Sequence, residues 1–186
     1  MNISLVKVRK PSIGIPEVTP PLGIMYLAGY LRKYRPGKDN VKIFDLSVQS
    51  EDYVIENLKD SDIVGLSSTN RDGLYLSNVI KHIRKANTRC KLILGGPIAS
   101  SLMDELFDHF DIDCAVAYEG EQTFLELIEK FDGGNIPFEN IKGIVYKNGS
   151  SKFTGRRETI ENLDDEIPFP AWDLIIENPL SKEYWK

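Results

Sequence analysis

The sequence predicts an α/β protein with a flavodoxin-like, doubly wound parallel sheet. Five short apolar strand patterns alternate with helical patterns, which is the arrangement that produces a parallel sheet covered by helices. The strand patterns are apolar almost throughout, as strands buried on both faces are. Four of them end in small or polar residues, and a parallel sheet gathers such ends at one edge. The expected strand order is 2-1-3-4-5, with a small C-terminal β-hairpin extension.

The first part of the chain predicts two strands and two helices. Apolar residues recur at helical spacing from Leu22 to Leu31, and Pro36-Gly37 ends that pattern. Gly23 and Gly29 lie on the same helix, and we expect them to mark its close approach to the sheet. The predicted strands here are 3–8 and 41–45, and the predicted helices are 22–34 and 51–59.

The middle of the chain repeats the strand–helix alternation three times. Asp72 precedes a strongly amphipathic pattern and is a suitable helix cap. Cys114 lies in an apolar strand pattern and is expected to be buried as a small hydrophobe. The predicted strands are 62–66, 91–94 and 114–118, and the predicted helices are 72–86, 98–110 and 120–131.

The pattern changes after Pro137. Asn148-Gly149 lies between two strand-like runs, Ile141–Tyr146 and Ser151–Thr154, and this dipeptide is the strongest short signal for a hairpin. The last segment is acidic, rich in proline and aromatic, which is typical of a linker that packs on another surface. We therefore divide the chain into an α/β domain (1–136), a hairpin extension (137–162) and a linker (163–186).

Composition excludes several classes of function. The formal net charge of −5 argues against nucleic acid, which requires a basic face. No apolar run reaches the roughly 18–20 residues of a membrane span, and no signal peptide precedes the first strand, so the expected location is the cytoplasm. Cys90 and Cys114 match no zinc or iron–sulfur spacing. We expect no metal site and no catalytic residue in this chain.

Three strand ends supply the candidate binding residues. Ser67, Ser68 and Thr69 offer hydroxyls for a polar ligand group, or they cap the next helix. The turn formed by Gly95, Gly96 and Pro97 allows close backbone approach to a ligand, or it is simply a tight turn. Glu119 and Gly120, which precede Glu121, either bind a polar ligand group or are structural.

These segments together resemble the N-terminal cobalamin-binding domain of the cobalamin-dependent radical S-adenosylmethionine enzymes. The resemblance covers most of residues 3–175 and implies a corrin lying on the strand ends, with its nucleotide tail inserted at the sheet edge. It implies that Ser67, Ser68 and Thr69 line the tail, that Gly95, Gly96 and Pro97 let it pass, and that Glu119 and Gly120 close the far side. Loop 10–21 would face the cobalt side. The motifs are Pro20-Pro-Leu-Gly-Ile-Met-Tyr-Leu-Ala-Gly-Tyr30, Asp62-Ile-Val-Gly-Leu-Ser67, Leu92-Ile-Leu-Gly-Gly-Pro97, Ala117-Tyr-Glu-Gly-Glu121 and Ile167-Pro-Phe-Pro-Ala-Trp-Asp-Leu174.

The chain departs from this family's patterns in two places. Loop 9–21 lacks the Asp-x-His-x-x-Gly motif with which some cobalamin domains ligate cobalt, although radical members of the family often lack it too. The Cys-x-x-x-Cys-x-x-Cys motif for a [4Fe–4S] cluster is also missing. The resemblance therefore implies a non-catalytic fragment of a radical enzyme or a stand-alone binding protein. The cluster, S-adenosylmethionine and the catalytic barrel would belong to the full-length protein, as partners in cis, with Phe169 and Trp172 packing on the barrel.

A flavin- or nucleotide-binding module on the same fold is the alternative, because the same serine and glycine loops suit phosphate groups. Against this alternative, the chain has no acidic residue in a dinucleotide fingerprint. A phosphoacceptor receiver domain is excluded. It needs an acid pair after the first strand and a lysine after the fifth, where this chain has Arg9-Lys10 and Glu119-Gly120-Glu121.

Overall fold

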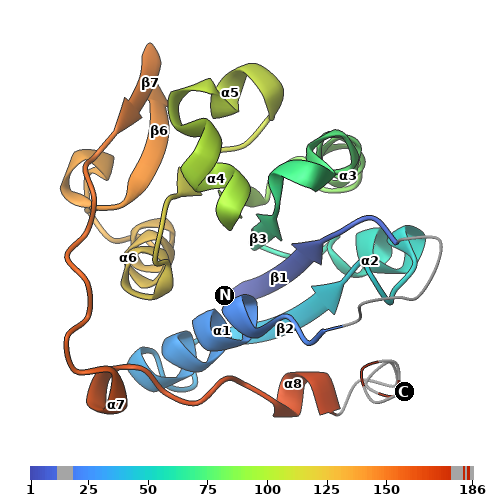
Figure 1. The fold of residues 1–186 in the computed structure, drawn as a ribbon, viewed down its shortest axis with the longest axis horizontal. Coiled ribbons are helices and arrows are strands. Elements are labelled where there is room, and N and C mark those ends of the chain that lie inside the picture. Colours follow the sequence, from blue (N-terminus) through green and yellow to red (C-terminus); the bar gives the residue numbers. More distant parts are fainter. Residues whose placement is uncertain (12–18, 177–181, 183, 185–186) are drawn as a thin grey trace.

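A single mixed sheet forms the centre of the molecule in the computed structural model, which describes residues 1–11, 19–176, 182 and 184. In this part of the chain the strand order is β2-β1-β3-β4-β5-β6-β7 (Figure 1). The strands are β1 (Asn2–Val8), β2 (Asn40–Asp45), β3 (Ile63–Ser68), β4 (Lys91–Gly95), β5 (Cys114–Val116), β6 (Ile144–Asn148) and β7 (Ser150–Phe153).

The first five strands are parallel and confirm the predicted order 2-1-3-4-5. The hairpin of β6 and β7 is antiparallel and continues the same sheet, because β6 pairs with β5. Its turn is made by Gly149, whose φ of +75° is the left-handed conformation that glycine adopts without strain. The hairpin therefore covers the edge that β5 would otherwise leave open.

Helices cover both faces of the sheet (Figure 1). One face, which includes Val6, Leu66 and Leu94, packs against α2, α3, α4 and α5. The opposite face, which includes Leu5, Ile63 and Ile93, packs against α1 and α6. The helices are α1 (Leu22–Tyr34), α2 (Glu51–Asn57), α3 (Gly73–Ala86), α4 (Pro97–Leu102), α5 (Leu106–His109), α6 (Glu121–Phe131), α7 (Leu163–Glu166) and α8 (Asp173–Ile176), with short 3-10 turns η1 (Asn70–Asp72), η2 (Met103–Glu105) and η3 (Phe138–Asn140).

Two local predictions were wrong. The helix expected over 98–110 is divided into α4, η2 and α5 at Met103, whose φ is 46°. The break occurs where β7 lies against η2, and that contact between distant segments has no local sequence signal. Asp72 precedes α3 but makes no capping bond. Its carboxylate instead accepts the backbone N–H of Lys10 at 3.1 Å and the hydroxyl of Thr69 at 2.9 Å, and so ties together the loops after β1 and β3.

The C-terminal segment runs along the outer side of α1 (Figure 1). Ala171 donates its N–H to the carbonyl of Met25 at 3.1 Å, and Ile175 is 3% exposed in the core beneath. Trp172 is partly buried against this chain's own core, and Phe169 is 91% exposed, so the packing of these two residues on a barrel stays a prediction. Gly29 faces this segment and not the sheet, so its predicted role was also wrong.

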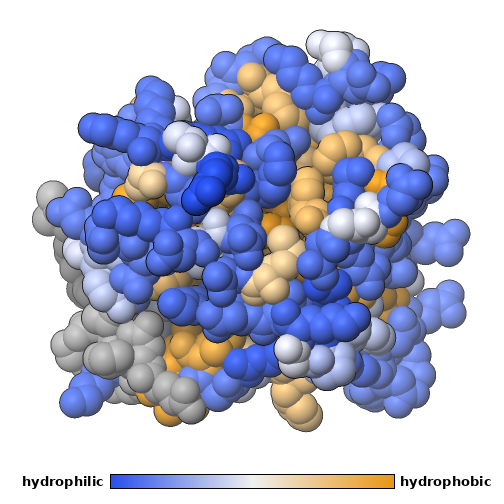
Figure 2. All heavy atoms as spheres, turned by 180° about the vertical axis from the view of Figure 1, so that it is seen from behind, coloured by the Kyte–Doolittle hydropathy of each residue, from blue (hydrophilic) through white to orange (hydrophobic). Residues whose placement is uncertain are grey.

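One face of the molecule is mostly hydrophilic (Figure 2). Seen from behind, hydrophobic side chains show only in limited stretches between hydrophilic ones (Figure 2). Among the described residues, no helix has the length and apolar character needed to cross a bilayer.

Candidate functional site

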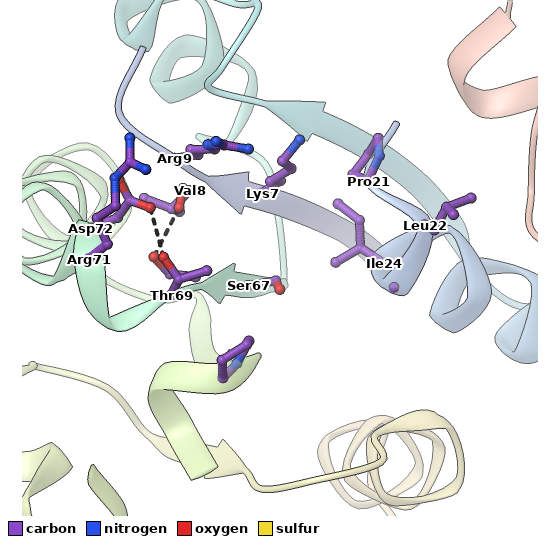
Figure 3. A pocket seen from close by; sticks show the side chains of 13 residues that line it. Lys7, Val8, Arg9, Pro21, Leu22, Ile24, Ser67, Thr69, Arg71 and Asp72 are labelled. Carbon is purple, nitrogen blue, oxygen red and sulfur yellow. Dashed lines mark hydrogen bonds between the residues drawn. The ribbon is translucent and has the colours of Figure 1, made fainter. Parts of the chain in front are cut away.

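A cavity of about 360 Å³ opens at the carboxyl ends of β1 and β3. We call it the strand-end cavity. Figure 3 shows that β1, the start of α1 and the segment after β3 all contribute side chains to it. Its volume lies at the lower end of the range for small-molecule sites, about 300–1,000 Å³. It is lined by Lys7, Val8, Arg9, Pro21, Leu22, Gly23, Ile24, Ser67, Ser68, Thr69, Arg71, Asp72 and Pro97.

A second cavity of about 170 Å³ lies between α1 and α6, over the face of the sheet. We call it the interhelix cavity. Most of its walls are apolar, and its floor includes a glycine of β3, Gly65. It is lined by Leu5, Gly23, Ile24, Leu27, Gly65, Leu66, Ser67, Ile93, Gly95, Gly96, Val116, Tyr118, Glu119, Gly120, Glu121 and Phe124.

The two cavities adjoin, since Gly23, Ile24 and Ser67 line both. All eight residues predicted from the strand ends line one or both of them. Parallel pairing explains this convergence, because Val8 pairs with Ser68 and Ser67 pairs with Gly95. Loop 10–21, expected to face the cobalt side of a corrin, falls outside the described residues at positions 12–18.

The three hydroxyls after β3 have different surroundings. The Ser68 hydroxyl is buried and donates to the carbonyl of Val8 at 2.9 Å. The Thr69 hydroxyl donates to Asp72 (Figure 3). The hydroxyl of Ser67 makes no hydrogen bond with the part of the chain that the structure describes, and it lies where the two cavities meet. Ser67 is therefore the hydroxyl of this group that is available to a ligand.

Two glycines shape the site in different ways. At Gly96, with φ +81°, a Cβ would lie 2.8 Å from the carbonyl oxygen of Ser68 and 2.9 Å from the hydroxyl of Ser67. Its small size is thus required by the packing of β4 on β3. At Gly65, a Cβ would lie 2.8 Å from Leu5 Cδ2 and 3.4 Å from Phe124 Cζ. A side chain at position 65 would therefore occupy the floor of the interhelix cavity.

Charge at the strand-end cavity is partly neutralised by the protein itself. Lys7 Nζ lies 3.0 Å from the buried carboxylate of Asp45 and 2.8 Å from the carbonyl oxygen of Thr19. Tyr184 donates its hydroxyl to the same carboxylate at 2.9 Å. Burial and the charge of Asp45 raise the pKa of Tyr184 above its usual range, so this phenol stays protonated. Arg71 lines the cavity without an ion pair to the described residues.

Sequence reasoning missed the apolar residues that line the interhelix cavity. Ile24, Leu27 and Phe124 belong to helix faces that the apolar periodicity assigns to the core, and only tertiary packing shows that they leave a hollow. Gly65 could have been identified from the sequence, because a glycine inside a buried strand often marks the close approach of a ligand or of another backbone.

The arrangement is suited to holding a ligand. In the described part of the chain, no group of three or more His, Cys, Asp or Glu side chains is placed to bind a metal ion. A parallel sheet with polar strand ends, a glycine turn and an adjoining apolar hollow defines an α/β domain that binds an extended cofactor at the switch point of its sheet.

The chain belongs to the B12-binding domain family, whose model matches residues 13–128. An uncharacterized methyltransferase of Pyrococcus horikoshii is 32% identical over 164 residues, which cover 84% of this chain and 34% of that protein. Cytidylyl-2-hydroxyethylphosphonate methyltransferase of Streptomyces wedmorensis is 25% identical over 201 residues, covering 85% of this chain and 37% of that protein.

Similarity extends to a solved structure. The cobalamin-dependent S-adenosylmethionine radical enzyme OxsB, with aqua-cobalamin bound, matches with a TM-score of 0.80 and 25% identity. The match covers 97% of this chain and 25% of OxsB. The fold is therefore that of the cobalamin-binding part of such enzymes. The chain spans only about a third of the length of the curated relatives that it matches.

Proposed function

We propose that this chain is the cobalamin-binding part of a longer radical S-adenosylmethionine enzyme of the methyltransferase type. Membership of the B12-binding family and the similarity to two methyltransferases and to OxsB support this proposal. Cobalamin would supply a cobalt centre able to carry a methyl group. The residues of this chain would bind and orient the cofactor, since binding and placement are what a protein contributes to cofactor chemistry.

The observation that carries the proposal is the pair of adjoining cavities. Cobalamin consists of a wide corrin ring and a long tail that ends in an aromatic base. The strand-end cavity, with its polar and cationic rim, suits the amide-bearing edge of the ring. The interhelix cavity is narrower and mainly apolar, and its floor lacks a side chain at Gly65. It would take the aromatic base, and the hydroxyl of Ser67 would meet the polar part of the tail.

The remainder of the longer protein would hold the [4Fe–4S] cluster and S-adenosylmethionine, for which this chain has no cysteine motif. The position of Phe169 supports the proposal that another domain of the same longer protein packs on this chain. Its backbone is fixed against α1 while its side chain is 91% exposed. A fixed, exposed aromatic residue is a suitable anchor for another domain, because little conformational freedom is lost when it is covered.

The test is titration of the 186-residue chain with hydroxocobalamin, followed by the visible spectrum. Binding with the base inserted between α1 and α6 should detach the base from cobalt, which shifts the spectrum. No spectral change with this chain or with the longer protein would contradict the proposal, as would tight binding of FMN in place of cobalamin.

A paired substitution tests the position of the base. Gly120 has an ordinary φ of −102°, and its Cβ would lie 3.4 Å from Leu27 Cδ2, so Gly120→Leu fills the interhelix cavity without backbone strain. It should weaken binding and reduce the spectral shift. Gly73→Leu is the matched control, since Gly73 also begins a helix and lines neither cavity. Equal losses in the two variants would contradict the placement.

A further inference from the structure

Tyr118 has an unfavourable backbone conformation at the edge of the interhelix cavity. Its φ is +64°, and in the described chain the other non-glycine residue with positive φ is Met103. A residue with a Cβ is strained in this region, which glycine occupies freely. The conformation is held by the hydroxyl of Ser100, which accepts the N–H of Tyr118 at 2.8 Å. Strain of this kind is concentrated at ligand sites and persists where the surroundings fix it.

The aromatic ring of Tyr118 belongs to a residue that lines the interhelix cavity, and one face of the ring is covered. Tyr118 lines the interhelix cavity and yet is 44% exposed. The guanidinium of Arg156 lies 4.6 Å from the ring centroid and covers one face of the ring, and the ring of Phe153 lies 6.3 Å away. Arg156 makes no ion pair with the described residues, so its contact with the ring is not set by a carboxylate. One face of the ring is thus supported by Arg156, and the residue that carries the ring lines the cavity in which a ligand would lie.

We propose that Tyr118 is the specificity-determining residue of the interhelix cavity and that its ring stacks on the planar aromatic base of a corrinoid tail. Arg156 is the positioning residue that holds the ring over the cavity mouth. This inference rests on the proposed function and deepens it, because it names the residue that recognises the base. The stacking role explains why a tyrosine occupies position 118, where the backbone conformation favours glycine.

The experiment compares two corrinoids, hydroxocobalamin and cobinamide, which lacks the nucleotide tail and its base. Tyr118→Gly relieves the backbone conformation and should leave Tm unchanged or raise it. The same variant should weaken cobalamin binding about tenfold, the size expected for the loss of one base–aromatic stack, and leave cobinamide binding unchanged. Arg156→Gln should weaken cobalamin binding about two- to fivefold, and Arg156→Lys should restore part of the loss, because a lysine retains the cation over the ring.

Met103→Gly is the matched control. It relieves the backbone strain at the other non-glycine residue with positive φ, and Met103 lines neither cavity. It should bind both corrinoids like the unsubstituted chain. Unchanged cobalamin binding by Tyr118→Gly, or equal losses for both corrinoids, would overturn the inference while leaving the proposed function intact. If the unsubstituted chain and the longer protein bind neither corrinoid, the proposed function fails, and the inference fails with it.

Discussion

A Cβ added to Gly29 would lie 2.6 Å from the carbonyl oxygen of Phe169. This contact joins the middle of α1 to a segment 140 residues later in the chain. It lets the backbone of the C-terminal segment lie directly on the helix, where Ala171 then donates its N–H to Met25. The absence of a side chain at Gly29 is thus explained by a contact on the outer side of the helix, away from the sheet.

Gly29→Ala should destabilise the protein by about 1–3 kcal/mol, because the added methyl group must displace a backbone carbonyl. Urea unfolding measures this change. Gly23→Ala is the control on the same helix, since nothing lies within 4 Å of its Cβ, and it should stabilise the chain by at most about 1 kcal/mol. Equal effects of the two substitutions would show that the contact with Phe169 does not limit this position.

Deletion of residues 163–186 should weaken the domain but leave it folded. The deletion removes the buried side chains of Ala171 and Ile175 from the edge of one core cluster, while most of the two layers of core around the parallel sheet remains. The free energy of unfolding should fall by about 2–5 kcal/mol, and the transition should stay cooperative. A truncated chain without a cooperative transition in urea would refute this expectation.

Ser67→Ala and Ser68→Ala should have opposite consequences. Ser67 has an unused hydroxyl between the cavities, so its loss should weaken cobalamin binding about threefold to tenfold and leave stability unchanged. The hydroxyl of Ser68 is bonded to the carbonyl of Val8, so its loss should lower the free energy of unfolding by about 1–2 kcal/mol. Titration and thermal unfolding of both variants separate the two roles. A loss of stability in Ser67→Ala without weaker binding would contradict the assignment.

Asp113 should make stability depend on pH in the acid range. Burial alone would raise its pKa, but hydrogen bonds from Arg84, the N–H of Leu92 and Lys91 outweigh burial and hold the pKa below its ordinary value of 3.8. The carboxylate of Asp113 therefore binds a proton more readily in the unfolded chain than in the folded protein. The stability that Asp113 contributes is complete above about pH 3.8 and is lost as the pH falls through the lower pKa of the folded state.

Asp113→Asn should therefore lower the free energy of unfolding at pH 7 by about 1–3 kcal/mol and flatten its pH dependence below pH 4. Denaturant unfolding between pH 2 and pH 7 measures both effects. Asp111→Asn is the control, because Asp111 contacts the same Arg84 at 3.4 Å but its side chain is 79% exposed. It should change stability by less than about 1 kcal/mol. Similar pH profiles for the two variants would contradict the role of Asp113.

Much of the site could be predicted from the chain because parallel sheets impose a simple geometry. Once the alternation of strands and helices is read, the residues after β3, β4 and β5 must meet at one edge. The roles of individual residues could not be read in this way. Gly96 lines the interhelix cavity, but the structure adds that a Cβ there would meet β3 itself, and Ser68 lines the strand-end cavity while its hydroxyl bonds to Val8. The ligand contacts predicted for both residues stay predictions.

Local signals determined the strands, most of the helices, their order in the sheet and the group of loops at the binding edge. Apolar periodicity and turn residues act over a few positions, and they are written in the sequence. Tertiary packing alone decided the hollow between α1 and α6, the break in the helix at Met103, the docking of the C-terminal segment on Gly29 and the strained backbone of Tyr118. Each of these depends on contacts between segments far apart in the chain, and no short pattern records which distant atoms will meet.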